Sequence, residues 1–164
     1  MLEAVLQTLD QQIEVHRKLL DLSEQKKHAI VRNEIDSLMQ VTQKETKLAK
    51  QAEELEAARI EAVNAFMRSK NMFVTAAITI GTLIRFVTRA EDKQALAVRR
   101  DELVRLTGQL KEANELNRQL LEQSLAYIDY SINLLVGPDQ EAVYHPPQLE
   151  QHAYTANRVF DWKA

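Results

Sequence analysis

Residues 90–136 read AEDKQALAVRRDELVRLTGQLKEANELNRQLLEQSLAYIDYSINLLV. Apolar residues recur along them at steps of seven, the spacing at which an α-helix returns to the same face. Glu91 and Asp92 would lie in the first turn, where the helix dipole favours acidic side chains. Gly137 and Pro138 follow directly and are typical of a helix C-terminus. The sequence therefore predicts a single helix over this whole range.

Two rows of residues on this predicted helix would face other helices. The first row changes from leucine to polar residues: Leu96, Leu103, Leu110, Asn117, Ser124 and Ser131. The second row lies three residues on: Leu106, Ala113, Leu120, Tyr127 and Leu134. The polar residues, Asn114 among them, would either fix the alignment of the helices or bond to the backbone of a bound peptide.

Apolar residues between positions 116 and 136 spread over more than one face of this helix. A helix that is apolar nearly all round must be buried on several sides. Either other helices of the chain cover this surface, or it receives an amphipathic helix from a partner.

Residues 2–69 predict two further helices. Apolar residues recur at steps of four and three over 2–30 and again over 38–66, the spacing of coiled coils. Asn33 lies at the break between them, and asparagine tolerates turn conformations. The two helices are therefore expected to form an antiparallel hairpin.

Three polar residues interrupt the apolar rows of this hairpin. His16 is expected at the edge of the core with a hydrogen-bond partner, rather than as a pH switch. Glu45 would face position 20, and Arg59 would face position 6. Because a buried charge is costly unless it is paired, each should have a partner or reach solvent. They would fix the register of the hairpin or contact a partner protein.

Residues 73–88 read FVTAAITIGTLIRFVT and are rich in β-branched residues. Strand is favoured by propensity, but a lone strand would have no partner in this chain, so a short helix is preferred. With only three glycines and three prolines, the chain lacks the turn residues of a β-sandwich or a doubly wound fold. The predicted fold is all-α: an elongated antiparallel helical hairpin or coiled-coil bundle of three long helices and a short middle helix. The bundle domain would span 1–136.

Composition excludes several classes of function. The net charge is −3 and the signs are interspersed, so no basic patch is available for nucleic acid. There is no cysteine, no phosphate-binding glycine loop and no metal-binding histidine motif, which predicts a protein without enzymatic activity, metal or cofactor. The longest uncharged run, residues 71–84, is too short to span a bilayer, and the N-terminus lacks the features of a signal peptide, so a cytoplasmic protein is expected.

Residues 137–164 differ in composition from the helices. Pro138, Pro146 and Pro147 oppose regular helix. The segment is nevertheless rich in aromatic residues, whereas disordered tails are poor in them: Tyr144, Tyr154, Phe160 and Trp162. This irregular tail would either fold back onto the apolar surface of the last helix or act as a docking motif.

Several short motifs together resemble a known family. They are Glu45, the Leu55-Glu56-x-x-Arg59 step, Asn114-x-x-Asn117 followed by Leu120-Leu121 and Leu125, and the ending Phe160-Asp161-x-Lys163-Ala164. In this order and in a chain of this length, they resemble the FlgN-like flagellar export chaperones. The resemblance implies a cytosolic helical protein that binds the C-terminal helices of hook–filament junction proteins. It would keep them from assembling early and deliver them to the export gate of the flagellar type III secretion system.

The resemblance also implies site residues. The cargo-binding surface would consist of Leu116, Leu120, Leu121, Leu125, Ile128, Ile132 and Leu135. Tyr144 matches a tyrosine associated with docking on the export gate, although His145-Pro146-Pro147 replaces the glycine-containing turn of the family. Alternatively, the tail would cap the apolar face through Val159, Phe160 and Trp162 when cargo is absent. The competing function is a structural coiled-coil adaptor, a homo-oligomer that self-associates through residues 116–136.

Overall fold

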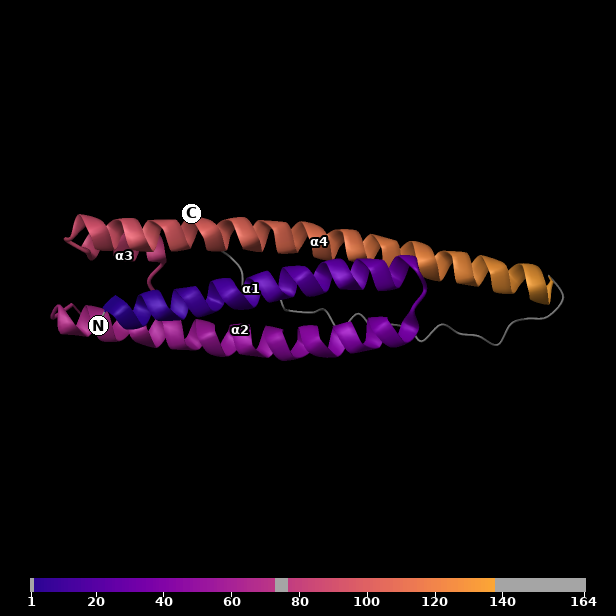
Figure 1. The fold of residues 1–164 in the computed structure, drawn as a ribbon, viewed down its shortest axis with the longest axis horizontal. Helices are drawn as coiled ribbons and strands as arrows, with labels where there is room; N and C mark the ends of the chain where they lie inside the picture. The colour runs from indigo at the N-terminus through magenta and orange to yellow at the C-terminus, as the bar shows by residue number, and fades with distance from the viewer. Residues whose placement is uncertain (1, 73–76, 138–164) are drawn as a thin grey trace. The chain divides into compact units, whose positions relative to one another are not determined.

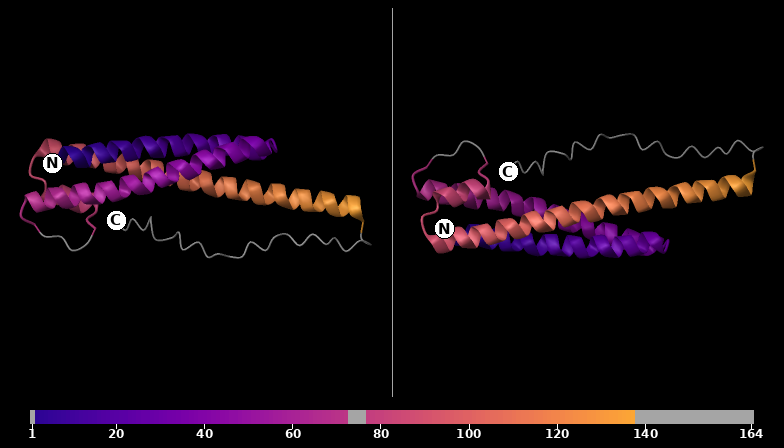
Figure 2. Two further views of the ribbon diagram at one scale, coloured as in Figure 1. Left: turned by 90° about the horizontal axis from the view of Figure 1, so that it is seen from below. Right: turned by 90° about the horizontal axis from the view of Figure 1, so that it is seen from above.

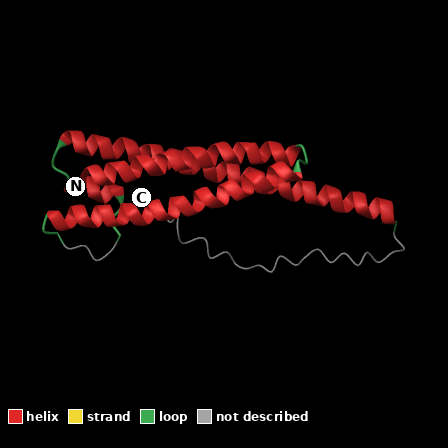
Figure 3. Ribbon diagram, turned by 60° about the horizontal axis from the view of Figure 1, so that its bottom comes forward, coloured by secondary structure: helices red, strands yellow, loops and turns green. Residues whose placement is uncertain are grey.

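The computed structural model describes residues 2–72 and 77–137. These residues form four helices, α1 (Leu2–Val31), α2 (Ile35–Ser69), α3 (Ile80–Phe86) and α4 (Ala90–Val136), shown in Figure 1. Within the described residues there is no strand (Figure 3). The all-α prediction of three long helices and a short one is confirmed.

The chain divides into two compact units. The first is Met1–Ser124 and contains α1, α2, α3 and most of α4. The second begins at Leu125, and the structure describes it as far as Gly137. The boundary lies within α4, and apart from the half-buried Ser131 the residues of α4 from Leu125 to Val136 are exposed.

Two asparagines reverse the chain at the ends of α1 and α2. Asn33 and Asn71 have positive φ angles of 54° and 57°. After each helix, the amide two residues beyond the cap bonds back to a carbonyl of the last turn, at 3.0 Å for Glu34 to Ala29 and 3.1 Å for Met72 to Met67. This is the Schellman arrangement, in which a left-handed residue closes the helix. The predicted turn at Asn33 is confirmed, and the N-cap of α2 is the next residue, Glu34.

Polar contacts fix the directions of the helices in the first unit. Gln12 bonds to Glu56 and Lys26 bonds to Glu45, so α2 runs antiparallel to α1. Asp10, Arg17 and Ser23 of α1 bond in that order to Arg99, Glu102 and Asn117, so α4 runs parallel to α1 in this unit. Figure 2 shows α1 and α2 side by side.

The register of the hairpin differs from the prediction. Glu45 bonds to Lys26 rather than facing position 20, with 2.8 Å between Nζ and Oε2. Arg59 pairs with Glu56 on its own helix. The turn is centred at Asn33 and Glu34, and the long side chains of Lys26 and Glu45 reach along the helices, so the contacts lie further along α1 than a simple count predicts.

The main core joins all four helices. Its buried members come from α1, α2, α3, the residue after α3, and the first half of α4: Val5, Leu9, Ile13, Val63, Phe66, Met67, Ile80, Leu83, Val87, Leu96, Leu103 and Leu106. No apolar residue of α4 after Leu106 is buried. Because burial of each such side chain stabilises the fold by about 1.5–3 kcal/mol, the hydrophobic contribution of α4 comes from its first half.

The short helix α3 is shorter than the predicted segment 73–88. Thr79 caps it, with its Oγ1 accepting from the amide of Thr82 at 3.1 Å. Ile80 and Leu83 point into the core. Residues 73–76 lie outside the described part of the chain. The preference for helix over strand is confirmed for Ile80–Phe86, which buries its apolar side against the long helices.

No helix in the described residues is long and apolar enough to cross a membrane. The predicted tail, apart from Gly137, lies outside the described residues.

Candidate binding surface on the last helix

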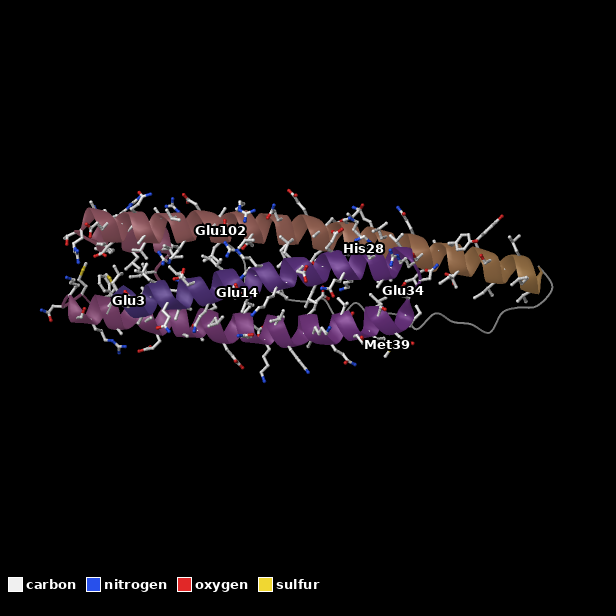
Figure 4. All side chains as sticks on the ribbon, in the orientation of Figure 1. Glu3, Glu14, His28, Glu34, Met39 and Glu102 are labelled. Atoms are coloured by element: carbon white, nitrogen blue, oxygen red, sulfur yellow. The ribbon has the colours of Figure 1, made fainter. Side chains whose placement is uncertain are left out.

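The first half of α4 is held firmly on α1. Arg99 binds Asp10 through two bonds, of 2.7 Å from Nε and 2.9 Å from Nη2. Arg17 donates to Glu102 at 2.8 Å, and Figure 4 shows Glu102 on the side of α4 next to α1. Hydrogen bonds from Arg105 and Arg17 lower the pKa of Glu102 to about 2. These charged contacts flank the buried leucines and fix the parallel alignment.

The buried contact between α1 and α4 changes from apolar to polar at Asn117. Asn117 is buried, and its Nδ2 donates to the backbone oxygen of Ser23 at 2.8 Å and to its hydroxyl at 3.1 Å. The Ser23 hydroxyl in turn donates to Asn114 at 3.3 Å. The Oδ1 atom of Asn117 is buried without a hydrogen-bond partner. The prediction that Asn114 and Asn117 align helices is confirmed for the contact with α1, at the cost of one unpaired polar atom.

Beyond this junction α4 is apolar yet exposed. Between Leu125 and Val136 the sequence carries a single charge, Asp129. The large apolar residues that this segment exposes are Leu125, Tyr127, Ile128, Tyr130, Ile132, Leu134, Leu135 and Val136. Exposed fractions reach 70% for Tyr127 and 86% for Leu135. Contiguous exposed apolar surface of this kind is typical of an interaction site.

These exposed residues form two stripes on opposite sides of the helix. The first, which we call the aliphatic stripe, is spaced by three, four and three residues: Leu125, Ile128, Ile132 and Leu135. The second, the tyrosine stripe, follows each of the first three members by two residues: Tyr127, Tyr130 and Leu134. A step of two residues is about 200° of helical rotation, so the stripes lie nearly opposite each other.

The predicted cargo-binding residues divide between these stripes. Leu125, Ile128, Ile132 and Leu135 form the aliphatic stripe, and Leu121, also exposed, precedes it by four residues. Leu120 is half-buried. It lies seven residues before Tyr127 and fourteen before Leu134, so it is on the same side of the helix as the tyrosine stripe. Leu116 is exposed and, four residues before Leu120, shares that side.

The cargo-binding residues expected from the sequence do not include the tyrosine stripe. Tyr127, Tyr130 and Leu134 are each more exposed than Leu125. Their spacing of three and four was visible in the sequence, but Tyr127 and Leu134 were placed in a row that faces other helices. A periodic apolar row does not itself distinguish a buried face from an open one.

The charged residues just before the stripes form ion pairs along the helix. Arg118 pairs with Glu115 at 2.8 Å and with Glu122 four residues on. Hydrogen bonds from Arg118, and then from Gln119, lower the pKa of Glu115 to about 2. Because these ion pairs are solvent-exposed, they add little to stability.

A separate polar cluster lies inside the hairpin. Arg59, only 4% exposed, pairs with both carboxylate oxygens of Glu56 at 2.8 and 2.6 Å, and it reaches the backbone oxygen of Ile78 at 3.4 Å. Gln12 bonds to the same carboxylate at 2.9 Å. Burial raises the pKa of Glu56, but the hydrogen bonds and charge of Arg59 outweigh it and bring the pKa below its usual value. The cluster ties α1 and α2 to the segment before α3.

His16 also has the structural role that the sequence predicted. It is buried, and its Nδ1 lies 2.7 Å from the backbone oxygen of Gln12. A carbonyl oxygen only accepts, so Nδ1 carries the proton. Glu45 and Arg59 likewise have partners, as expected of charges on an apolar face.

Nothing in the described part of the chain suggests a metal centre. Across residues 2–72 and 77–137, no group of three or more histidine, aspartate or glutamate side chains could hold a metal ion. Other exposed apolar residues gather near the hairpin turn, at Val31, Ile35 and Met39, but they are fewer than those on the last turns of α4. The two stripes are therefore the most extensive candidate surface.

Comparison with known proteins identifies a family and a relative of this chain. The family model described as FlgN protein matches residues 1–151. A protein of Bacillus subtilis (strain 168) named "Uncharacterized protein YvyG" is 29% identical over 164 residues, which cover 99% of this chain and 98% of that protein. No solved structure matches the chain.

Proposed function

The chain belongs to the FlgN protein family, and we propose that it is a cytoplasmic chaperone that binds the C-terminal helices of flagellar hook–filament junction proteins. Membership supports a chaperone-like role in flagellar export in general. The proposal adds the cargo, the binding surface on α4 and delivery to the type III export gate.

The observation that carries the proposal is the exposed aliphatic stripe. Its members recur at steps of three and four, the spacing with which one helix packs against another in a coiled coil. An amphipathic cargo helix would lay its apolar face along Leu125, Ile128, Ile132 and Leu135 and remove them from water. The same apolar face of the cargo would then be unavailable for early self-association.

The surroundings of the stripe suit a reversible complex. Asp129 is the single charge between Leu125 and Val136, so charge interactions there contribute little to the choice of cargo helix. Binding would rest on apolar contact, which is non-directional and needs no covalent step. The chaperone can therefore release its cargo without chemistry.

Calorimetric titration of the full chain with the C-terminal segment of a hook–filament junction protein tests the proposal. We expect one-to-one saturable binding. Leu125→Glu/Ile128→Glu should abolish it, because two carboxylates would be buried without partners. The matched control is Val98→Glu/Val104→Glu, which changes two exposed valines on the first half of α4.

Equal loss of binding in both pairs of variants, with helix content intact by circular dichroism, would contradict the assigned surface. Absence of binding by the unsubstituted chain at tens of micromolar would contradict the cargo itself.

A self-associating adaptor is the second candidate, because a stripe with this spacing also fits the same stripe of a second copy. Sedimentation equilibrium separates the two functions. A tight homo-oligomer that Leu125→Glu/Ile128→Glu dissociates would favour the adaptor, and a monomer that binds cargo would favour the chaperone. Docking of Tyr144 on the export gate stays a prediction, since Tyr144 lies outside the described residues.

A further inference from the structure

We infer that the C-terminal segment, residues 138–164, docks on the tyrosine stripe of α4 and leaves the aliphatic stripe open for a partner. The inference goes beyond the proposed function, which concerns the aliphatic stripe alone. It assigns each of the two exposed apolar sides of α4 a different occupant.

A single partner helix does not cover both stripes. Tyr127, Tyr130 and Leu134 lie about 200° around the helix from the aliphatic stripe, whereas a helix contacts its neighbour over roughly 100°. With a partner on the aliphatic stripe, these three residues would still face water, and each of them is more than 60% exposed. The tyrosine stripe is therefore available to a second occupant.

The chemistry of the two stripes selects different occupants. The aliphatic stripe has the regular spacing that suits another helix. Pro146 and Pro147 prevent residues around them from forming such a helix, because proline lacks the amide hydrogen and clashes with the preceding turn. Proline-containing segments instead dock on surfaces lined by aromatic side chains, as Tyr127 and Tyr130 provide.

The aromatic residues of the segment add to this match. Tyr144, Tyr154, Phe160 and Trp162 can pack edge-to-face or offset against tyrosine rings. The prolines and Tyr144 lie close together in the sequence, so one short piece of chain carries both kinds of contact.

The covalent connection makes this docking intramolecular. Gly137 ends α4 with a φ of 72°, a left-handed conformation that turns the chain away from the helix axis. The helix from Tyr127 to Val136 is about 15 Å long at ~1.5 Å per residue. About five extended residues at ~3.3 Å each cover that distance, so residues 144–147 are within reach of both tyrosines. The short tether raises the effective concentration of the segment at the stripe.

Trp162 is the single tryptophan of the chain and reports directly on the docking. In the full chain without cargo, we expect short-wavelength emission and slow quenching by acrylamide, both independent of protein concentration. Tyr127→Ser/Tyr130→Ser should shift the emission to longer wavelength and bring the quenching rate to that of the chain unfolded in urea. Leu125→Ser/Ile128→Ser, a matched pair on the opposite stripe, should leave both values unchanged.

Three outcomes would overturn the inference. Quenching in the unsubstituted chain as fast as in urea would mean that the segment is undocked. A change in emission or quenching in Leu125→Ser/Ile128→Ser alone would place the segment on the aliphatic stripe, where it would compete with cargo. Concentration-dependent emission would mean docking between copies. Each outcome is independent of the cargo titration, so failure here is distinguishable from failure of the proposed function.

Discussion

The two halves of α4 use the same kind of apolar spacing with opposite results. In the first half, Leu96, Leu103 and Leu106 are buried against the other helices of the first unit. In the last turns, Leu125, Ile128, Ile132 and Leu135 recur just as regularly and stand exposed. Periodicity therefore sets which side of a helix is apolar, whereas the presence of neighbouring helices decides whether that side is buried.

The largest expected contrast comes from truncating one leucine in each half. Leu96→Ala should lower the free energy of unfolding by about 2–5 kcal/mol, because it opens a cavity among fully buried side chains. Leu125→Ala should change it by less than about 0.5 kcal/mol, because that side chain is already in water. Urea unfolding followed by circular dichroism measures both. Similar losses in the two variants would show that the second half is also packed in solution.

Asn117→Leu tests the boundary between the packed and the exposed half of α4. It removes the unpaired buried Oδ1 and extends the apolar contact of Leu96 and Leu103, so we expect about 1–2 kcal/mol of added stability. Thermal unfolding of the variant and of the exposed control Asn133→Leu measures the effect. A loss of stability would mean that the two hydrogen bonds to Ser23 outweigh the unpaired atom.

Substitutions at two helix ends compare the stability of the hairpin with that of the exposed end of α4. Asn33→Ala places an ordinary side chain at a φ of 54° within the hairpin and should destabilise the first unit by about 1 kcal/mol. Gly137→Ala introduces the same strain at the end of the exposed half, and the first unit should keep its unfolding midpoint. Equal shifts of the midpoint in urea would show that the end of α4 unfolds together with the hairpin.

The smallest expected effect is a pH dependence confined to the packed region. The pKa of Glu56 is below its usual value in the folded chain, so its contribution is present above the unfolded pKa near 4.5 and is lost as pH falls through the folded value. Because Glu56 is partly solvated, the contribution should be below about 1 kcal/mol. Unfolding by urea at several pH values should show a shallower loss below pH 4.5 for Glu56→Gln than for the exposed control Glu54→Gln. Identical slopes would exclude a role for this carboxylate.

Much of the fold was predictable because it depends on local signals. Spacing located all three long helices, and Gly137 and Asn33 marked their ends through their tolerance of positive φ. The hairpin register was predicted less well, since the reach of Lys26 and Glu45 decides which residues meet. The sequence prediction did not identify the partner of Arg59. That partner is Glu56, which lies on the same helix and binds Arg59 through both carboxylate oxygens.

The sequence by itself determined that the chain is all-α, where its long helices begin and end, and that the last turns of α4 are apolar on two sides. These properties follow from residue periodicity and from the conformational limits of glycine, asparagine and proline, which act over a few neighbours. Only the tertiary structure decided that the contact between α1 and α4 passes from leucine to Asn117 and that the apolar residues beyond it are exposed. Burial depends on which helices are present at each point along α4, and no local pattern contains that information.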